Sequence, residues 1–158
     1  MSAPSSTLPA QGTLMKGKKG LVMGVANERS IAWAIASAVA AQGGEVAFTY
    51  QGEALGKRVT PLAQSIGSNL VLPCDVSDDA AIDETSASLE KEWGELDFVV
   101  HAIGLPDKQY PCGRYLASLP DASLTALNLS CSSCLVFPQL AARVLKPGGS
   151  LPTLRFPA

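Results

Sequence analysis

The stretch GLVMGVANERSIAWAIASAVAAQ, residues 20–42, decides the fold of this chain. Its first six residues are an apolar run containing a glycine, which is typical of a strand buried on both faces. Asn27 is expected to cap the following helix. Residues 30–42 then carry apolar side chains at helical spacing, and Gly43 supplies the stop. The stretch therefore predicts a strand, a turn and a helix, the first unit of an α/β sheet.

The same alternation of strand and helix continues along the chain. Three further apolar runs predict strands at residues 45–50, 69–74 and 96–103. A polar-faced helix is expected over 56–66, and another ends at Trp93 after a cap at Ser77 or Asp78. This order predicts an α/β fold with a doubly wound, Rossmann-like parallel sheet.

After Gly104 the pattern weakens. Residues 105–120 resemble a loop, and residues 121–145 resemble a helix that contains Pro138, which removes a backbone hydrogen bond. A fifth strand is expected over 150–156, where Pro152 favours an edge position. The sequence thus predicts a flexible tail over residues 1–19 and an incomplete dinucleotide-binding domain over residues 20–158, truncated after about the fifth strand.

Composition excludes several classes of protein. Hydrophobic residues make up 47% of the 158 residues and charged residues 16%, so a packed core is expected and not disorder. The net charge of −2 argues against nucleic acid as a partner, and no apolar run is long enough for membrane insertion. The first residues lack the apolar segment of a signal peptide, so the four cysteines are expected to be reduced thiols in the cytoplasm.

Ligands of open α/β sheets bind beyond the carboxyl ends of the strands, so the residues there are the first candidates. Gly24, after the first strand, lets the backbone approach a pyrophosphate, and Ser30 with the following helix amides can donate to its oxygens. A glycine between a strand and a helix is also a common turn residue with no ligand. Gln51, after the second strand, can bond a ribose diol but cannot balance a 2′-phosphate, which favours NAD over NADP. Lys57 and Arg58 lie one turn further, and a nearby cation could balance a 2′-phosphate, so the choice between NAD and NADP stays open.

Two further strand ends carry candidates. Asp75 can accept a hydrogen bond from an adenine amino group, and Val76 can cover the ring; Asp75 is equally a turn or cap residue. Ile103 can pass beneath the nicotinamide ribose, and the alternative is a tight turn with Gly104 after a buried strand.

Four short motifs together resemble one family, the bacterial NADH-dependent enoyl-[acyl-carrier-protein] reductases, divergent members of the short-chain dehydrogenase superfamily. These motifs are Gly24-x5-Ser30-Ile31-Ala32, Phe48-Thr-Tyr-Gln51, Cys74-Asp-Val76 and Val100-His-Ala-Ile-Gly104. The resemblance is dense over residues 16–104 and loose over 114–154. It implies that NAD contacts Gly24, Ser30, Ile31, Gln51, Asp75, Val76 and Ile103. Pro106 stands where the family begins its contact with the acyl substrate.

The resemblance implies an activity and also a departure from it. The family reduces trans-2-enoyl thioesters on acyl carrier protein during fatty-acid biosynthesis, using a tyrosine hydroxyl to stabilise the enolate and a lysine to hold the cofactor ribose. Phe156 aligns with the family's first tyrosine, and the later catalytic tyrosine and lysine have no counterpart here. No catalytic residue is therefore assigned, and this chain is expected to be inactive. The family forms homo-oligomers, which is doubtful for this chain.

Alternatives to an enzyme remain open on the sequence alone. The alternative interpretation is a non-catalytic NAD-binding or interaction domain, either a pseudoenzyme or a truncated gene product. Tyr50 and Lys57 have the family's Tyr-x6-Lys spacing but follow the second strand, far from a nicotinamide. His101, the single histidine, is expected to be a packed residue, and Cys131-x2-Cys134 lacks a second ligand pair, so no metal site is predicted.

Overall fold

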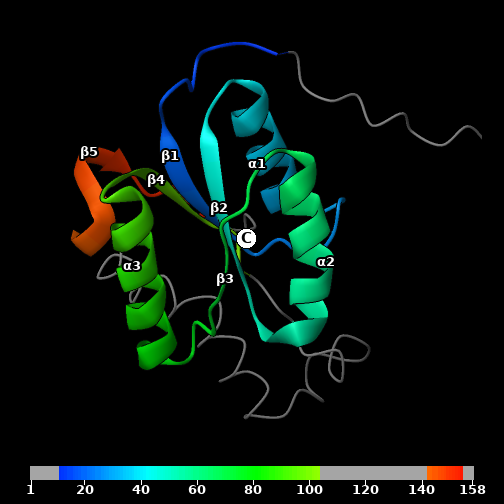
Figure 1. Ribbon diagram of the computed structural model, residues 1–158, viewed down its shortest axis with the longest axis vertical. Coiled ribbons are helices and arrows are strands. Elements are labelled where there is room, and N and C mark those ends of the chain that lie inside the picture. The colour runs from blue at the N-terminus through cyan, green and yellow to red at the C-terminus, as the bar shows by residue number, and fades with distance from the viewer. Residues whose placement is uncertain (1–10, 104–141, 155–158) are drawn as a thin grey trace, which may run out of the picture.

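A computed structural model describes residues 11–103 and 142–154 of the chain (Figure 1). Strands and helices alternate through its first part, as the sequence predicts. The elements in chain order are β1 (Lys19–Met23), α1 (Ile31–Ala41), β2 (Glu45–Tyr50), α2 (Gly52–Ser65), β3 (Val71–Pro73), α3 (Asp79–Trp93), β4 (Leu96–His101) and β5 (Leu145–Ser150).

The strands form one parallel sheet in the order β3-β2-β1-β4-β5. Leu21 of β1 lies opposite Ala47 of β2 on one side and Val99 of β4 on the other. The chain moves outward from β1 to β3 and then returns to the far side of β1 as β4, so strand order reverses at β1. The predicted doubly wound parallel sheet is confirmed, and this reversal marks the place where such sheets bind ligands.

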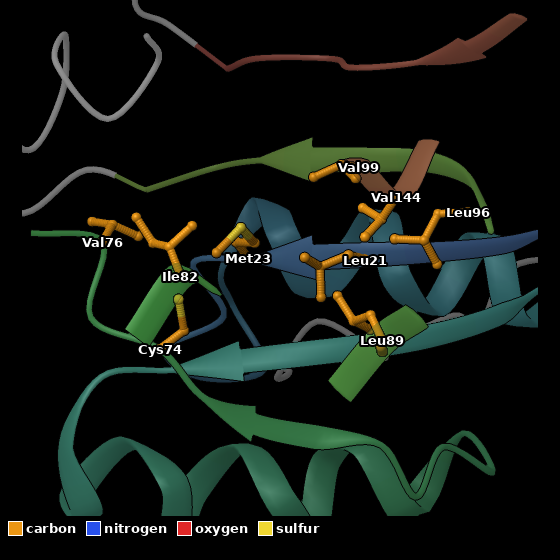
Figure 2. Close-up of a cluster of buried hydrophobic side chains, with 10 residues drawn as sticks. Leu21, Met23, Cys74, Val76, Ile82, Leu89, Leu96, Val99 and Val144 are labelled. Carbon is orange, nitrogen blue, oxygen red and sulfur yellow. The ribbon is translucent and has the colours of Figure 1, made fainter. Parts of the chain in front are cut away.

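Helices cover both faces of the sheet. In Figure 1, α1 and α2 lie on one side and α3 on the other. Leu21 and Met23 point toward α3, where they pack with Ile82 and Leu89 (Figure 2). Val22, between them in sequence, belongs to the second cluster, under α1 and α2. Alternate residues of β1 thus enter opposite cores, which explains why the sequence of this strand is apolar throughout.

Two helices begin elsewhere than predicted. The N-cap of α1 is Ser30, while Asn27 Oδ1 accepts a 2.8 Å hydrogen bond from the Arg29 amide in a turn before the helix. Helix α2 starts at Gly52, four residues before the expected start at Gly56. Gly56 lies inside α2, at a point where a Cβ would stand 2.7 Å from the Tyr50 ring. That glycine is a close-packing residue, not a helix start.

The fifth strand is displaced from its predicted position. It runs over Leu145–Ser150, and within the described part of the predicted range, residues 151–154, Thr153 forms an isolated bridge with His101. The register shifts between Leu96 and Phe98 of β4, opposite the PGG segment at residues 147–149. A proline without an N–H and Gly148 at φ 81° let the backbone bulge there, so a segment that resembles a loop pairs as a strand.

The amino ends of the strands are held by an ionic cluster around Asp97. Its carboxylate accepts hydrogen bonds from the Lys18 ammonium at 3.0 Å and the Lys19 amide at 2.9 Å, and also pairs with Lys146. Part of the predicted tail over residues 1–19 is also anchored. The Gly12 amide donates to the carbonyl of Ala41, at the end of α1, over 2.9 Å. Across the described ranges, no helix is both long and apolar enough to span a bilayer.

Candidate functional site

A cavity opens at the carboxyl ends of the strands, where strand order reverses. Four separate segments after β1, β2, β3 and β4 contribute to it, and α2 adds one side chain. Its lining residues are Gly24, Val25, Ala26, Thr49, Tyr50, Gln51, Leu55, Cys74, Val76 and Ile103. Four of the residues expected to contact a dinucleotide, Gly24, Gln51, Val76 and Ile103, therefore share one cavity, although 79 positions separate the first from the last in sequence.

Gly24 brings the loop after β1 against the end of β4. Its φ is 88°, in the region that side chains avoid, and a Cβ would lie 2.1 Å from the carbonyl oxygen of Ala102. No larger residue fits without moving one of the two strands. This close packing holds the loop after β1 against the carboxyl end of β4, at the edge of the cavity that Gly24 lines.

The amino end of α1 has the properties of an anion site. Ser30 occupies the N-cap without capping, because its hydroxyl donates to the carbonyl of Asn27 at 2.6 Å. The first turn contains no acidic residue. Its amides and the positive end of the helix dipole are therefore available to a phosphate group. Ser30 and Ile31 are not among the cavity-lining residues, and Ile31 is 58% exposed.

Gln51 and Asp75 join the ends of β2 and β3. Gln51 Nε2 donates to Asp75 Oδ2 at 2.8 Å, and the other carboxylate oxygen accepts from the Ser77 hydroxyl at 2.6 Å and the Ser77 amide at 2.9 Å. These hydrogen bonds hold the pKa of Asp75 below its usual range, and the two from Ser77 have the largest effect. Asp75 is therefore both the turn residue and the charged neighbour of the cavity that its sequence position suggests.

The cavity also contains residues that were not expected to contact a cofactor. Cys74 is buried, burial raises the pKa of its thiol, and its contact with the cavity is that of a small apolar group. Leu55 reaches the cavity from α2. The one feature of the sequence that could have indicated Leu55 is that it is an isolated leucine in the otherwise polar first turn of that helix. Together with Val25 and Val76 these side chains give the cavity an apolar wall suited to a flat ring.

Other candidate residues lie elsewhere. Lys57 is 80% exposed, pairs with Glu53 at 3.9 Å, and borders a separate surface groove with Arg58 and Arg29. Tyr50 lines the cavity and its ring packs against Gly56; the surface groove that Tyr50 shares with Lys57 contains none of the residues expected to contact a cofactor. Pro106, Phe156, Cys131 and Cys134 lie outside the described residues.

His101 is a core residue at the end of β4. It is 1% exposed, burial lowers the pKa of its imidazole, and its backbone amide donates to the carbonyl of Pro152 at 3.0 Å. Among the residues that the structure describes, no group of three or more potential ligands is placed to hold a metal ion.

A second cavity lies at the opposite end of the sheet, beside the amino end of β2. Its lining includes Gly44, Ser68, Glu92 and Trp93. None of the residues expected to contact a cofactor lies there.

Comparisons with known proteins agree with this geometry. The family model described as enoyl-(acyl carrier protein) reductase matches residues 24–157. An enoyl-[acyl-carrier-protein] reductase [NADH] of Rhizobium meliloti is 50% identical over 143 residues, which are 90% of this chain and 53% of that protein. The chain thus spans about half the length of the curated relatives it matches.

Two solved structures have the same fold. An enoyl-(acyl-carrier-protein) reductase from Anaplasma phagocytophilum in complex with NAD is 48% identical, with a TM-score of 0.85 over 92% of this chain and 56% of that one. The reductase from Bacillus cereus, solved with NADP+ and an indole naphthyridinone, is 36% identical, with a TM-score of 0.83 over 89% of this chain and 55% of that one.

Proposed function

Because this chain belongs to the enoyl-(acyl carrier protein) reductase family, we propose that it forms the NAD-binding part of such a reductase. The substrate class is a trans-2-enoyl thioester carried on acyl carrier protein, and the setting is fatty-acid synthesis in the cytoplasm. One domain, residues 20–158, carries this function. NADH, when bound, supplies the hydride that reduces the double bond.

One observation carries the proposal. Gly24, Gln51, Val76 and Ile103, selected because each follows a different strand, line a single cavity at the point where strand order reverses. Open α/β sheets bind nucleotides at this point. The cavity is apolar on the side of Leu55 and polar at Gln51, as an adenosine requires, with a flat ring at one end and hydroxyl groups at the other.

Each residue has a distinct binding role in this proposal. Val76 covers the adenine ring, and Asp75 accepts from its amino group. Ser30 and the amides from Ile31 onward bind the pyrophosphate beside the bare backbone of Gly24. Ile103 passes beneath the nicotinamide ribose, and Pro106, three residues beyond the described segment, begins the acyl contact.

In this proposal, the binding of NADH and the reduction of an enoyl thioester by these 158 residues are two separate properties. Tyr50 and Lys57 are the one pair with Tyr-x6-Lys spacing in the sequence; Tyr50 lines the cavity beside Gln51, whereas Lys57 borders surface grooves outside it. Neither can reach a thioester at the nicotinamide end. We expect the 158 residues to bind NADH without reducing an enoyl thioester.

The test is a pair of measurements on the purified 158-residue chain. Binding is followed by NADH fluorescence, and turnover by the loss of NADH absorbance with an enoyl thioester. Saturable NADH binding without turnover supports the proposal as stated. Turnover above background would overturn the assignment of these residues to binding alone, and the absence of dinucleotide binding by the folded chain would overturn the proposal as a whole.

A further inference from the structure

We propose that Asp75 is a positioning residue for cofactor specificity, which acts through Gln51 to favour NAD over NADP. This inference rests on the proposed function. It assigns to the carboxylate after β3 a task that dinucleotide-binding sheets commonly give to an acidic residue after the second strand. Here the second strand ends in a neutral Gln51, and the negative charge comes from the neighbouring strand instead.

The orientation of the Gln51 amide is the first step. Gln51 Nε2 is anchored to Asp75 Oδ2 at 2.8 Å, so Oε1 lies on the other side of the amide group. Oε1 can only accept hydrogen bonds. A ribose 2′-hydroxyl can donate to it, whereas the oxygens of a 2′-phosphate are acceptors and leave it without a partner.

The charge of Asp75 is the second step. Ser77 holds the other carboxylate oxygen with two hydrogen bonds, from its hydroxyl and its amide. The same contacts hold the pKa of Asp75 below its usual range, so the carboxylate is ionised throughout the physiological range. A negative charge one hydrogen bond behind Gln51 attracts the hydroxyl proton of a ribose and repels a phosphate dianion.

The cations nearest in sequence do not offset this charge within the cavity. Lys57 is paired with Glu53, and both side chains are largely exposed, at 80% and 93%. Arg58 borders a separate surface groove, together with Arg29. Among residues 11–103 and 142–154, no lysine or arginine lines the Gln51 cavity.

The experiment compares dissociation constants for NADH and NADPH. The wild-type chain is expected to prefer NADH. Asp75→Asn is expected to narrow that preference by about two- to fivefold, the size of an exposed charge interaction, because the variant no longer repels the 2′-phosphate of NADPH. The preference of the wild type should also shrink at high salt, and that of Asp75→Asn should not.

Two variants separate specificity from folding. Asp75→Glu keeps the charge and is expected to restore most of the NADH preference. Ser77→Ala keeps both the charge and the Gln51 contact, and it is expected to leave the preference unchanged even if thermal stability falls. Asp75→Asn also loses the adenine contact that NADH and NADPH share, so the ratio of the two dissociation constants is the decisive quantity. An unchanged ratio in Asp75→Asn would overturn this inference alone. A wild-type chain that binds neither dinucleotide would overturn the proposed function as well.

Discussion

The α-carbon of Gly24 faces the carbonyl oxygen of Ala102 so closely that a Cβ on Gly24 would lie 2.1 Å from that oxygen. This contact joins the ends of β1 and β4, the two strands that flank the reversal of strand order. The backbone at Gly24 also has a φ of 88°, which disfavours any side chain.

Gly24→Ala is therefore expected to lower the free energy of unfolding by at least about 2 kcal/mol, through backbone strain and displacement of the two strands. It should also abolish dinucleotide binding under conditions where the variant remains folded. Urea unfolding and NADH fluorescence measure the two effects. Gly67→Ala is the matched control, because Gly67 has a φ of 80° but nothing within 4 Å of its added Cβ. Equal destabilisation by the two substitutions would show that the close contact with Ala102 adds nothing to the cost of Gly24→Ala.

Ser30→Asp is expected to move stability and binding in opposite directions. An aspartate at the N-cap of α1 can accept from the first-turn amides and complements the helix dipole, which should stabilise the fold by about 0.5–1 kcal/mol. The same carboxylate would occupy the amides assigned to the pyrophosphate and repel it. Ser30→Asn supplies a cap without the charge and should weaken binding less. Undiminished NADH binding by Ser30→Asp would contradict the phosphate assignment.

Buried His101 makes stability depend on pH. Burial lowers the pKa of the folded imidazole below its unfolded value near 6.5, so the unfolded chain binds a proton first. Stability is complete above about pH 6.5 and falls below it, by up to about 1.4 kcal/mol per pH unit. Urea midpoints at pH 7.5 and 5.5 measure the loss. Because His101 is the single histidine, the His101→Gln variant should show a nearly flat profile over this window, and an equally steep profile in that variant would rule out His101 as the source.

The Asp97 cluster predicts a second pH effect in a lower range. Burial opposes ionisation of Asp97, but hydrogen bonds from Lys146, the Lys19 amide and Lys18 outweigh it and hold the pKa of the carboxyl well below its usual range. Its contribution to stability is therefore complete above about pH 4 and is lost as the pH falls toward the folded pKa. Asp97→Asn should cost about 1–2 kcal/mol at neutral pH.

Asp83→Asn is the control for this prediction. Asp83 pairs with Arg143, and both side chains are more than 60% exposed, so the cost of losing the pair should stay below about 0.5 kcal/mol. Chemical unfolding at pH 7 compares the two variants. An Asp83→Asn variant as destabilised as Asp97→Asn would contradict the importance assigned to the Asp97 cluster.

The strands buried on both faces could be predicted closely from the sequence. Leu21, Val22 and Met23 are all apolar because neighbouring residues enter opposite cores. The fifth strand could not be placed in the same way. Its pairing with β4 passes through a bulge at Gly148, and a segment containing a proline and two glycines carries no periodic apolar signal.

The residues of the candidate site also differ in how far the sequence could predict them. Gly24, Gln51, Val76 and Ile103 could be selected because a residue that directly follows a parallel strand must lie at the ligand-binding edge. Leu55 could not, because its contribution depends on how α2 is rotated and where that helix begins. The hydrogen bond between Gln51 and Asp75 was also beyond the sequence, since it depends on the side-chain conformations of two residues 24 positions apart.

The most direct test of the central claim is a titration of the isotope-labelled chain with NADH, followed by backbone amide NMR. The account predicts saturable shifts that cluster at Gly24, Gln51, Val76 and Ile103, with Gly44 and Trp93 at the opposite end of the sheet unchanged. Shifts centred on Gly44 and Trp93, or no saturable shifts in a folded sample, would contradict the assignment of this cavity to the dinucleotide.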